Sequence, residues 1–331
     1  MIISKTPFRI SFLGGGTDFP AYYKYNPGKV VGMTIDKYCY IFFRHGNNLM
    51  DYNFRVAYSK IEMTKRIDKI GHISVKNTSK FFNHKKSFDI LHAGDLPAKS
   101  GLGSSSSFTV GLVNIFRKIN KFNLNRKNLA NDALEIEQNL SKENVGSQDQ
   151  IFAAYGGFNV INFKGKKYSV EKLNLKNKKK IIDSTFLVFT GLTRIASKIE
   201  KKKIANLDKN IKHLEKIYKY TIIGENILKS KNIDIKEFGN LIHEAWNEKK
   251  KLDSNVSNNF IDDIYNTAVE AGAYGGKLLG AGAGGFLCFI ADKKYHNRIF
   301  QKLKPLKIIK TGLSEEGSKI IVNYKNEYLK Y

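Results

Sequence analysis

The sequence has few cysteines and no long hydrophobic run. Among 331 residues the only cysteines are Cys39 and Cys288, and both lie in apolar, strand-like runs. Two such thiols indicate buried side chains in a reducing cytoplasm. The longest uncharged apolar run, Leu278–Ala291, is glycine-rich and shorter than the ~20 residues that a membrane helix needs. Residues Met1–Arg9 lack a basic region followed by an apolar one, so we expect neither a secretory signal nor a membrane partner.

Acidic residues are also scarce. The sequence contains 30 Asp and Glu residues and 56 Lys and Arg residues, which gives a net charge of +26. Such a charge suits a basic nucleic-acid-binding protein. The lysines are spread along the whole chain, however, and neither an aromatic–basic RNA-binding signature nor zinc-finger spacing occurs. We therefore expect a solvated lysine surface and no nucleic-acid partner. Its positive field would favour an anionic substrate such as ATP.

Several common nucleotide-binding signatures are missing. The chain contains no G-x-x-x-x-G-K-[ST] loop, and the H-R-D and D-F-G motifs of protein kinases are absent. A G-x-G-x-x-G match occurs at Gly280, Gly282 and Gly285. The segment that follows, Phe286–Ile290, is strand-like, whereas a dinucleotide site needs a helix there. We reject a dinucleotide site for this reason.

Strand and helix patterns alternate without a strict βαβ order, which predicts an α+β fold with a domain boundary near residue 180. The first domain, residues 1–180, and the second, residues 181–331, both mix helices and strands. Predicted strands lie at Ile2–Phe12, Val30–Ile35, Tyr38–Arg44, Phe88–Ala93, Phe158–Phe163 and Phe186–Thr190, and near Ile308–Lys310 and Lys319–Tyr324. Predicted helices follow the serine-rich segment and lie near Leu129–Leu140, Ile204–Leu228, Ile235–Leu252, Asn258–Ala271 and Tyr295–Leu303.

One loop has the composition of a phosphate cradle. A strand ends near Gly94, small residues follow, and a helix begins within or just after four consecutive serines. Exposed backbone N–H groups and the positive end of the helix dipole would bind phosphate there. A serine-capped helix after a flexible loop is the simpler alternative, but one cap needs fewer serines. The predicted phosphate-binding residues are Gly101, Leu102, Gly103, Ser104, Ser105 and Ser106.

Three segments together resemble the signatures of the GHMP kinases, in the order that this family has them. They are Pro7–Asp18, Pro97–Ser107 and Lys277–Phe286. The resemblance spans nearly the whole chain. It implies a two-domain architecture, with an N-terminal domain like ribosomal protein S5 domain 2 and a ferredoxin-like C-terminal domain. It also implies that ATP and Mg²⁺ are used, with ATP between the domains and its phosphates on the loop at 101–106.

The resemblance also implies roles for single residues. Asp149 would be the catalytic base, Arg9 would lie near the transferring phosphoryl group, and Glu137 would ligate Mg²⁺ together with Ser105. A carboxylate suits proton abstraction and a guanidinium suits phosphoryl charge. The simpler alternative for Asp149 is a helix cap, and for Glu137 it is a solvated helix residue.

The first signature ends in Gly-Gly-Gly-Thr-Asp, which resembles a sugar 1-kinase subgroup. This subgroup includes D-glycero-D-manno-heptose 7-phosphate kinases and L-fucokinases. Segments 143–150 and 190–197 resemble the same subgroup, and the E-H-T-D ending of galactokinases is absent. Substrate contacts would come from Gly15, Gly16, Thr17, Asp18, Gly282, Arg194 and Lys277. A turn role is the alternative for Asp18, and surface charge is the alternative for the two cations.

These observations predict an ATP-dependent kinase that phosphorylates the C1 hydroxyl of a heptose 7-phosphate. By resemblance the 1,7-bisphosphate would feed the synthesis of a nucleotide-activated heptose for surface polysaccharide. An L-fucose or other hexose 1-kinase is the nearest alternative, and a basic nucleic-acid-binding protein is the alternative from another class. A homodimer is compatible with the sequence but is not required by it.

Overall fold

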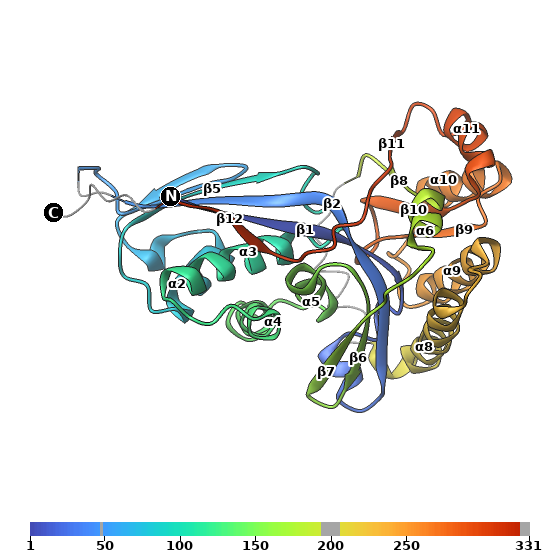
Figure 1. Cartoon of the computed structure of the whole chain (residues 1–331), viewed down its shortest axis with the longest axis horizontal. Coiled ribbons are helices and arrows are strands. Elements are labelled where there is room, and N and C mark those ends of the chain that lie inside the picture. The colour runs from blue at the N-terminus through green and yellow to red at the C-terminus, as the bar shows by residue number, and fades with distance from the viewer. Residues whose placement is uncertain (47–48, 193–205, 325–331) are drawn as a thin grey trace.

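The molecule contains two β-sheets, each with its own helices. The structure is a computed structural model that describes residues 1–46, 49–192 and 206–324. Within these ranges the strands form one sheet of eight strands and one of four. Figure 1 shows the two sheets toward opposite ends of the long axis of the molecule. The predicted α+β class is therefore confirmed.

The larger sheet is built on two long antiparallel strands, β1 (Ile2–Leu13) and β2 (Gly28–His45). Its order is β12–β1–β2–β5–β3–β4, and β6 pairs with both β2 and β7. Nearly every residue of β1 is buried, including polar ones such as Thr6 and Arg9. The other strands are β3 (Phe54–Ala57), β4 (Ile61–Thr64), β5 (Phe88–Gly94), β6 (Phe158–Lys164), β7 (Lys167–Lys172) and β12 (Lys319–Asn323).

Helices cover one face of this sheet (Figure 1). The central one, α3 (Ser104–Ile119), is buried from Ser106 to Arg117 because it packs on β1 and β2. A Cβ atom on Gly111 of α3 would lie 2.7 Å from Thr6 Oγ1, so a glycine is needed for this close approach. Around α3 lie α2 (Ile73–Phe81), α4 (Arg126–Leu134), the π-helical turn η2 (Glu135–Leu140) and α5 (Gln148–Tyr155). Short helices α1 (Pro20–Tyr23) and η1 (Ile67–Lys69) lie in connections.

The smaller sheet has the order β11–β8–β10–β9 and is antiparallel throughout. Its strands are β8 (Thr185–Phe189), β9 (Gly275–Leu278), β10 (Phe286–Ile290) and β11 (Lys307–Ile309). All five residues of β10 are buried, and Leu287 and Phe289 share an apolar core with the buried Trp246. The accompanying helices are α6 (Lys178–Ser184), α8 (Leu207–Lys229), α9 (Ile235–Lys250), α10 (Asn259–Glu270) and α11 (Lys293–Lys302).

The structure corrects two details of the predicted elements. The strands predicted at 30–35 and 38–44 are a single strand, because β2 continues through an irregular step in its register with β1 near Pro7. The final strand, β12, belongs to the larger sheet and pairs with β1, although its sequence follows the smaller sheet. The boundary near residue 180 stays a prediction, and the return of β12 means that the larger sheet draws on both ends of the chain.

Candidate active site

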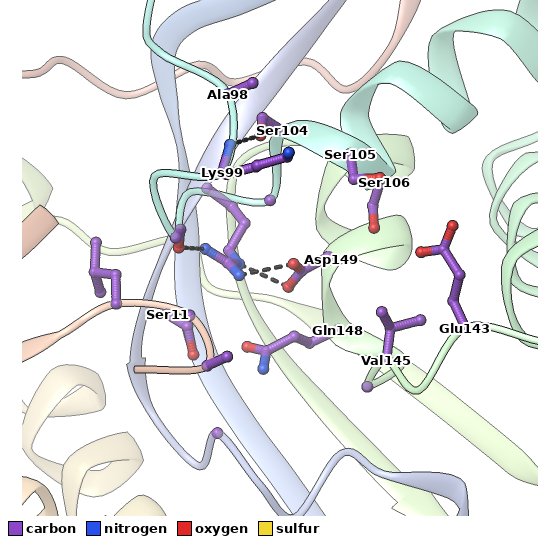
Figure 2. Close-up of a pocket in the computed structure, with 18 of the residues that line it drawn as sticks. Ser11, Ala98, Lys99, Ser104, Ser105, Ser106, Glu143, Val145, Gln148 and Asp149 are labelled. Atoms are coloured by element: carbon purple, nitrogen blue, oxygen red, sulfur yellow. Dashed lines mark hydrogen bonds and ion pairs between the residues drawn. The ribbon is translucent and has the colours of Figure 1, made fainter. Parts of the chain in front are cut away.

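A cavity of about 720 Å³ lies where loops from both sheets meet. Its walls come from the glycine-rich turn after β1, the loop between β5 and α3, the segment before α5, and the loop between β9 and β10. Figure 2 shows several of these side chains pointing into the same space. Residues that are distant in the sequence therefore share one site.

The loop between β5 and α3 presents a helix N-terminus to this cavity. Gly101 and Gly103 both have positive φ, at 83° and 75°, and α3 begins at Ser104 directly after them. Ser104, Ser105 and Ser106 line the cavity, as do both glycines. Backbone N–H groups at such a terminus bind phosphate. Leu102 is fully buried, and its carbonyl accepts the Arg9 backbone N–H at 3.1 Å, so its side chain anchors the loop and does not line the cavity.

The loop between β9 and β10 packs directly on this phosphate loop. A Cβ atom on Gly280 would lie 2.7 Å from Gly101 Cα, and one on Gly285 would lie 2.3 Å from Ser100 O. Phe286 N also donates a hydrogen bond to Ser100 O at 3.0 Å. Glycines are thus needed where the two loops touch through their backbones. Gly282, a predicted substrate residue, lines the cavity with φ of 121°.

Arg9 and Asp149 form a bidentate pair in the cavity. Arg9 Nε donates to Asp149 Oδ1 at 2.8 Å, and Arg9 Nη2 donates to Oδ2 at 2.7 Å. Arg9 Nη1 donates to Gly101 O at 2.6 Å, which ties the pair to the phosphate loop. A Cβ atom on Gly103 would lie 3.3 Å from Asp149 Oδ2. Arg9 therefore connects the predicted base to the predicted phosphate loop, and Figure 2 shows Asp149 directed into the same cavity as Ser105 and Ser106.

The glycine-rich turn after β1 forms another wall. Gly15, Gly16 and Asp18 line the cavity, and Asp18 is buried. Asp18 Oδ1 accepts the Gly16 N–H at 2.9 Å and Oδ2 accepts the Gln148 N–H at 3.3 Å. Burial raises the pKa of Asp18, and the charge of Asp149 adds to this effect. Asp18 therefore closes the turn, as its simpler alternative predicts, and also reaches the cavity.

Thr17 has a different role from the predicted one. Its side chain is fully buried, and its hydroxyl donates toward Gly14 O at 2.8 Å and Lys29 O at 2.9 Å. The hydroxyl also accepts the Lys29 N–H at 3.1 Å. These contacts fix the glycine turn against β2, so the prediction that Thr17 contacts substrate is corrected.

Glu137 forms a hydrogen bond with Ser106, whereas Ser105 is the serine predicted to bind Mg²⁺ together with it. Ser106 Oγ donates to Glu137 Oε2 at 2.8 Å, and Gln150 Nε2 also donates to this oxygen. Burial, followed by the negative charge of Glu143, raises the pKa of Glu137 to about 7. Ser105 is exposed and lines the cavity. The serine that touches Glu137 is thus the next one along α3, because Ser106 is buried whereas Ser105 is exposed.

Two lysines with buried side chains line the cavity. Lys277 Nζ donates to Phe12 O at 3.1 Å. Lys249 Nζ donates to Leu278 O at 2.9 Å and to Gly280 O at 2.7 Å, so it also holds the β9–β10 loop. Sequence reasoning singled out Lys277 but missed Lys249. The other predicted cation, Arg194, lies outside the described residues.

An aromatic group that the motifs did not indicate lines another part of the cavity. His72 stacks on Phe108 with ring centroids 4.6 Å apart, and Tyr58 contacts His72 edge-on at 4.8 Å. His92 contacts Phe108 at 5.1 Å. Burial lowers the pKa of His72 to about 4, so this ring is neutral at pH 7. Flat, uncharged rings suit a planar ligand group.

The donors near Ser106 fit a magnesium ion. In the part of the chain that the structure describes, no three His, Cys, Asp or Glu residues gather into a metal site. Mg²⁺ uses few protein carboxylates and keeps water and phosphate oxygens as its other ligands. Glu137 Oε1 is buried without a hydrogen-bond partner among these residues, and the Ser105 hydroxyl and the Glu143 carboxylate lie at the cavity wall. This oxygen-only set is suitable.

No helix among the described residues is long and apolar enough to cross a membrane.

Two family models match the chain. The model described as GHMP kinases N terminal domain matches residues 61–157, and the model described as GHMP kinases C terminal matches residues 225–306. The first range contains the phosphate loop, Glu137 and Asp149, and the second contains Lys249 and Lys277.

Curated proteins that are similar to this chain include sugar kinases. A D-glycero-alpha-D-manno-heptose 7-phosphate kinase from Campylobacter jejuni is 33% identical over 89% of this chain and 91% of its own length. A bifunctional fucokinase/GDP-fucose pyrophosphorylase from Arabidopsis thaliana is 29% identical over 63% of this chain but only 20% of its own length.

Solved structures with the same fold cover almost the whole chain. A D-glycero-D-manno-heptose 1-phosphate kinase from Bacteroides thetaiotaomicron has a TM-score of 0.78 at 24% identity, over 98% of this chain and 100% of that one. A Lactococcus lactis galactokinase in complex with galactose has a TM-score of 0.75 at 18% identity, over 96% and 94%. These likenesses confirm the predicted two-domain architecture.

Proposed function

This chain belongs to the GHMP kinases, and from that membership we propose that it transfers the γ-phosphoryl group of ATP to the C1 hydroxyl of D-glycero-D-manno-heptose 7-phosphate. The observation that carries the proposal is the Arg9–Asp149 pair, which contacts the phosphate loop inside a cavity large enough for two substrates. The relative from Campylobacter jejuni supports the choice of sugar.

The chemistry begins at the acceptor hydroxyl. Asp149 accepts the proton of this hydroxyl as its oxygen forms a bond to the γ-phosphorus, and the bond from that phosphorus to the bridging oxygen of ADP breaks. A carboxylate has about four acceptor positions, so Asp149 can receive the hydroxyl while it keeps both bonds from Arg9. The guanidinium would hold the base in place and stabilise negative charge on the transferring group.

The nucleotide would bind along the phosphate loop. Gly101, Gly103 and the three serines that follow offer backbone N–H groups and hydroxyls to its phosphates. The rings of Tyr58, His72 and Phe108 would receive the adenine, because stacking on neutral rings suits a flat base. Glu137 and Ser105 would hold Mg²⁺, which neutralises charge on the phosphate oxygens when it is bound.

The acceptor would lie against the glycine turn. Gly15 has little bulk, and the place of a Cβ atom there is 4.0 Å from Lys277 Nζ and 3.7 Å from Gln148 Nε2. A sugar can approach the backbone closely at this point. Asp18 would bind its hydroxyls, and Lys277 and Lys249 would bind its distal phosphate. Arg194 remains part of this proposed clamp, outside the described residues.

An L-fucose or other hexose 1-kinase is the second candidate, and the fucokinase relative favours it. The two candidates differ in whether the acceptor carries a phosphate. We propose the heptose phosphate because the longer and stronger likeness is to the heptose 7-phosphate kinase. We further propose that the enzyme works in the cytoplasm and that its product feeds a nucleotide-activated heptose for surface polysaccharide. A homodimer remains compatible with this proposal.

The test compares D-glycero-D-manno-heptose 7-phosphate with the unphosphorylated heptose. We expect the wild-type enzyme to prefer the phosphorylated sugar strongly in kcat/KM. Lys277→Met removes a buried cation from the acceptor end, which costs about 2–5 kcal/mol, or about 30-fold to 4,000-fold in kcat/KM for the phosphorylated sugar. The same variant should barely change the weak activity on the unphosphorylated heptose.

Lys250→Met is the matched control, because Lys250 is the neighbour of Lys249 on α9 and pairs with Asp262 at 3.6 Å away from the cavity. It should leave both activities unchanged. If the wild-type enzyme uses the two sugars equally well, or prefers L-fucose, the heptose phosphate assignment is wrong. Equal loss on both sugars in Lys277→Met would mean that this lysine does not recognise the phosphate.

A further inference from the structure

Glu143 is a carboxylate at the cavity wall to which the proposed reaction gives no role. It lies in the segment between η2 and α5, and its backbone N–H donates to Glu137 O at 2.9 Å. Figure 2 shows its side chain directed into the cavity, on the same side as Ser106. The Glu143 carboxylate has no hydrogen bond or ion pair with any of the residues at 1–46, 49–192 and 206–324.

A carboxylate at this position is unfavourable for polyphosphate binding by itself. The surrounding wall is built for anions, with the α3 N-terminus, Lys99 and Arg9. Two like charges about 4 Å apart repel each other by about 4 kcal/mol near a protein surface. A divalent cation between Glu143 and the phosphates would turn this repulsion into attraction.

Glu137 is a second carboxylate near the cavity with an unused oxygen atom. It is buried, and Ser106 and Gln150 occupy only its Oε2 atom. Its Oε1 atom has no hydrogen-bond partner within the described residues. A buried oxygen without a partner is costly, so a ligand for it is expected. Glu143 is close enough that its charge acts on Glu137. Glu143 thus lines the cavity together with Ser106, and the buried Glu137 carboxylate lies directly behind Ser106.

We propose that Glu143 is a ligand of the divalent cation, together with Glu137 and the Ser105 hydroxyl. In this arrangement Ser106 and Gln150 hold Glu137 in position. Carboxylate and hydroxyl oxygens are the hard ligands that Mg²⁺ and Mn²⁺ accept. The inference rests on the proposed function, because the cation would serve the nucleotide of that reaction.

A cation that is bound by the protein itself can be distinguished experimentally from one that enters only with the nucleotide. Two carboxylates give the empty enzyme enough negative charge to bind a divalent cation before any nucleotide is present. We therefore expect Mn²⁺ to bind the nucleotide-free enzyme, and to bind more tightly when ADP is added.

The experiment titrates the enzyme with Mn²⁺ and measures free Mn²⁺ by electron paramagnetic resonance, with and without ADP and always without sugar. Glu143→Gln keeps the shape of the side chain and removes its charge, and it should weaken Mn²⁺ binding about tenfold or more in both states. Glu135→Gln is the matched control, since Glu135 is an exposed residue near the same segment and accepts a hydrogen bond from Asn139 at 2.5 Å. It should bind Mn²⁺ as the wild-type enzyme does.

Equal Mn²⁺ affinity in Glu143→Gln and in the wild-type enzyme would overturn the inference, provided that the two melt at the same temperature. A Glu143→Asp variant that regains part of the affinity would support direct ligation, because it restores only the carboxylate. The titration contains no acceptor, so its outcome does not depend on the sugar. Failure to phosphorylate the heptose would count against the proposed function alone.

Discussion

Arg9 and Asp149 lie 140 positions apart in the sequence, yet their side chains make two parallel hydrogen bonds. The arginine is buried within the strand β1, while the aspartate stands in the first turn of α5. A third bond from Arg9 reaches Gly101 of the phosphate loop. One guanidinium thus connects the proposed base to the proposed phosphate-binding backbone, and a fixed geometry of this kind would lower the barrier to phosphoryl transfer.

Replacing the base tests this arrangement. Asp149→Asn should lower kcat by about 10²–10⁴, because an amide cannot accept the proton of the acceptor hydroxyl. The binding of ATP should remain nearly unchanged, because the phosphate loop does not require the carboxylate. Single-turnover kinetics and nucleotide titration measure the two effects separately. Turnover close to that of the wild-type enzyme would show that Asp149 is not the base and acts only as the partner of Arg9.

At the scale of whole elements, the two glycine-rich loops determine whether the site is assembled. Gly280 has φ of 71° and touches Gly101, so an added methyl group meets backbone and not a flexible side chain. Gly280→Ala should therefore displace the β9–β10 loop from the phosphate loop. A shift of about 1 Å in a catalytic site lowers kcat/KM by about 10²-fold. Steady-state kinetics and urea denaturation of the variant measure the effect.

Gly165→Ala provides the control for backbone strain. Gly165, in the turn between β6 and β7, has φ of 63° and nothing within 4 Å of an added Cβ atom. Both substitutions force a non-glycine residue into the left-handed region, at about 1–2 kcal/mol. Only Gly280→Ala adds a contact with another loop. If the two variants lose the same stability and keep the same activity, the contact between the loops has no catalytic importance.

The sequence predicts most elements and the motif residues, since each signature is local. The phosphate loop, Arg9, Asp18, Asp149 and Lys277 all come from short segments with a recognisable order. Which serine contacts Glu137, Ser105 or Ser106, could not be predicted from a local motif. Four consecutive serines look alike in sequence, and the rotation of α3 decides which hydroxyl meets Glu137.

Lys249 and the aromatic group of the cavity were also not predicted from the sequence, for two different reasons. Lys249 stands among three consecutive lysines, but it continues the buried face that carries Ile242, Ala245 and Trp246. This helical spacing is a signal that could have found it. The rings of Tyr58 and His72 come from a stretch without any motif. Their meeting depends on how β3, α2 and α3 pack, which no local pattern records.

At the scale of the whole molecule, the net charge of +26 should act on the encounter with anionic substrates. The Debye length shrinks from about 30 Å to about 8 Å between 10 mM and 150 mM salt. The KM for ATP should therefore rise about threefold or more over this range, while the buried contacts in the cavity change little. The KM of the unphosphorylated sugar, measured in parallel, should stay constant. A KM for ATP that ignores salt would show that the surface lysines do not attract the nucleotide.

Duplex DNA binding measured over the same range of salt tests the nucleic-acid alternative. Charge alone gives duplex DNA binding that falls steeply with salt and shows no preferred sequence. We expect such binding to disappear near 150 mM salt. Binding that persists and selects a sequence or structure would instead support a role for this charge beyond substrate attraction.

The position of β12 has a consequence for the order in which the molecule is completed. β12 is the last described strand, and it covers the edge of β1, the first strand. While the ribosome is still making the smaller sheet, that edge of β1 has no partner. An unpaired edge can pair with another chain. The larger sheet therefore closes only after the smaller sheet has been made, and a chain shortened before β12 should aggregate, although it retains every described residue of the cavity.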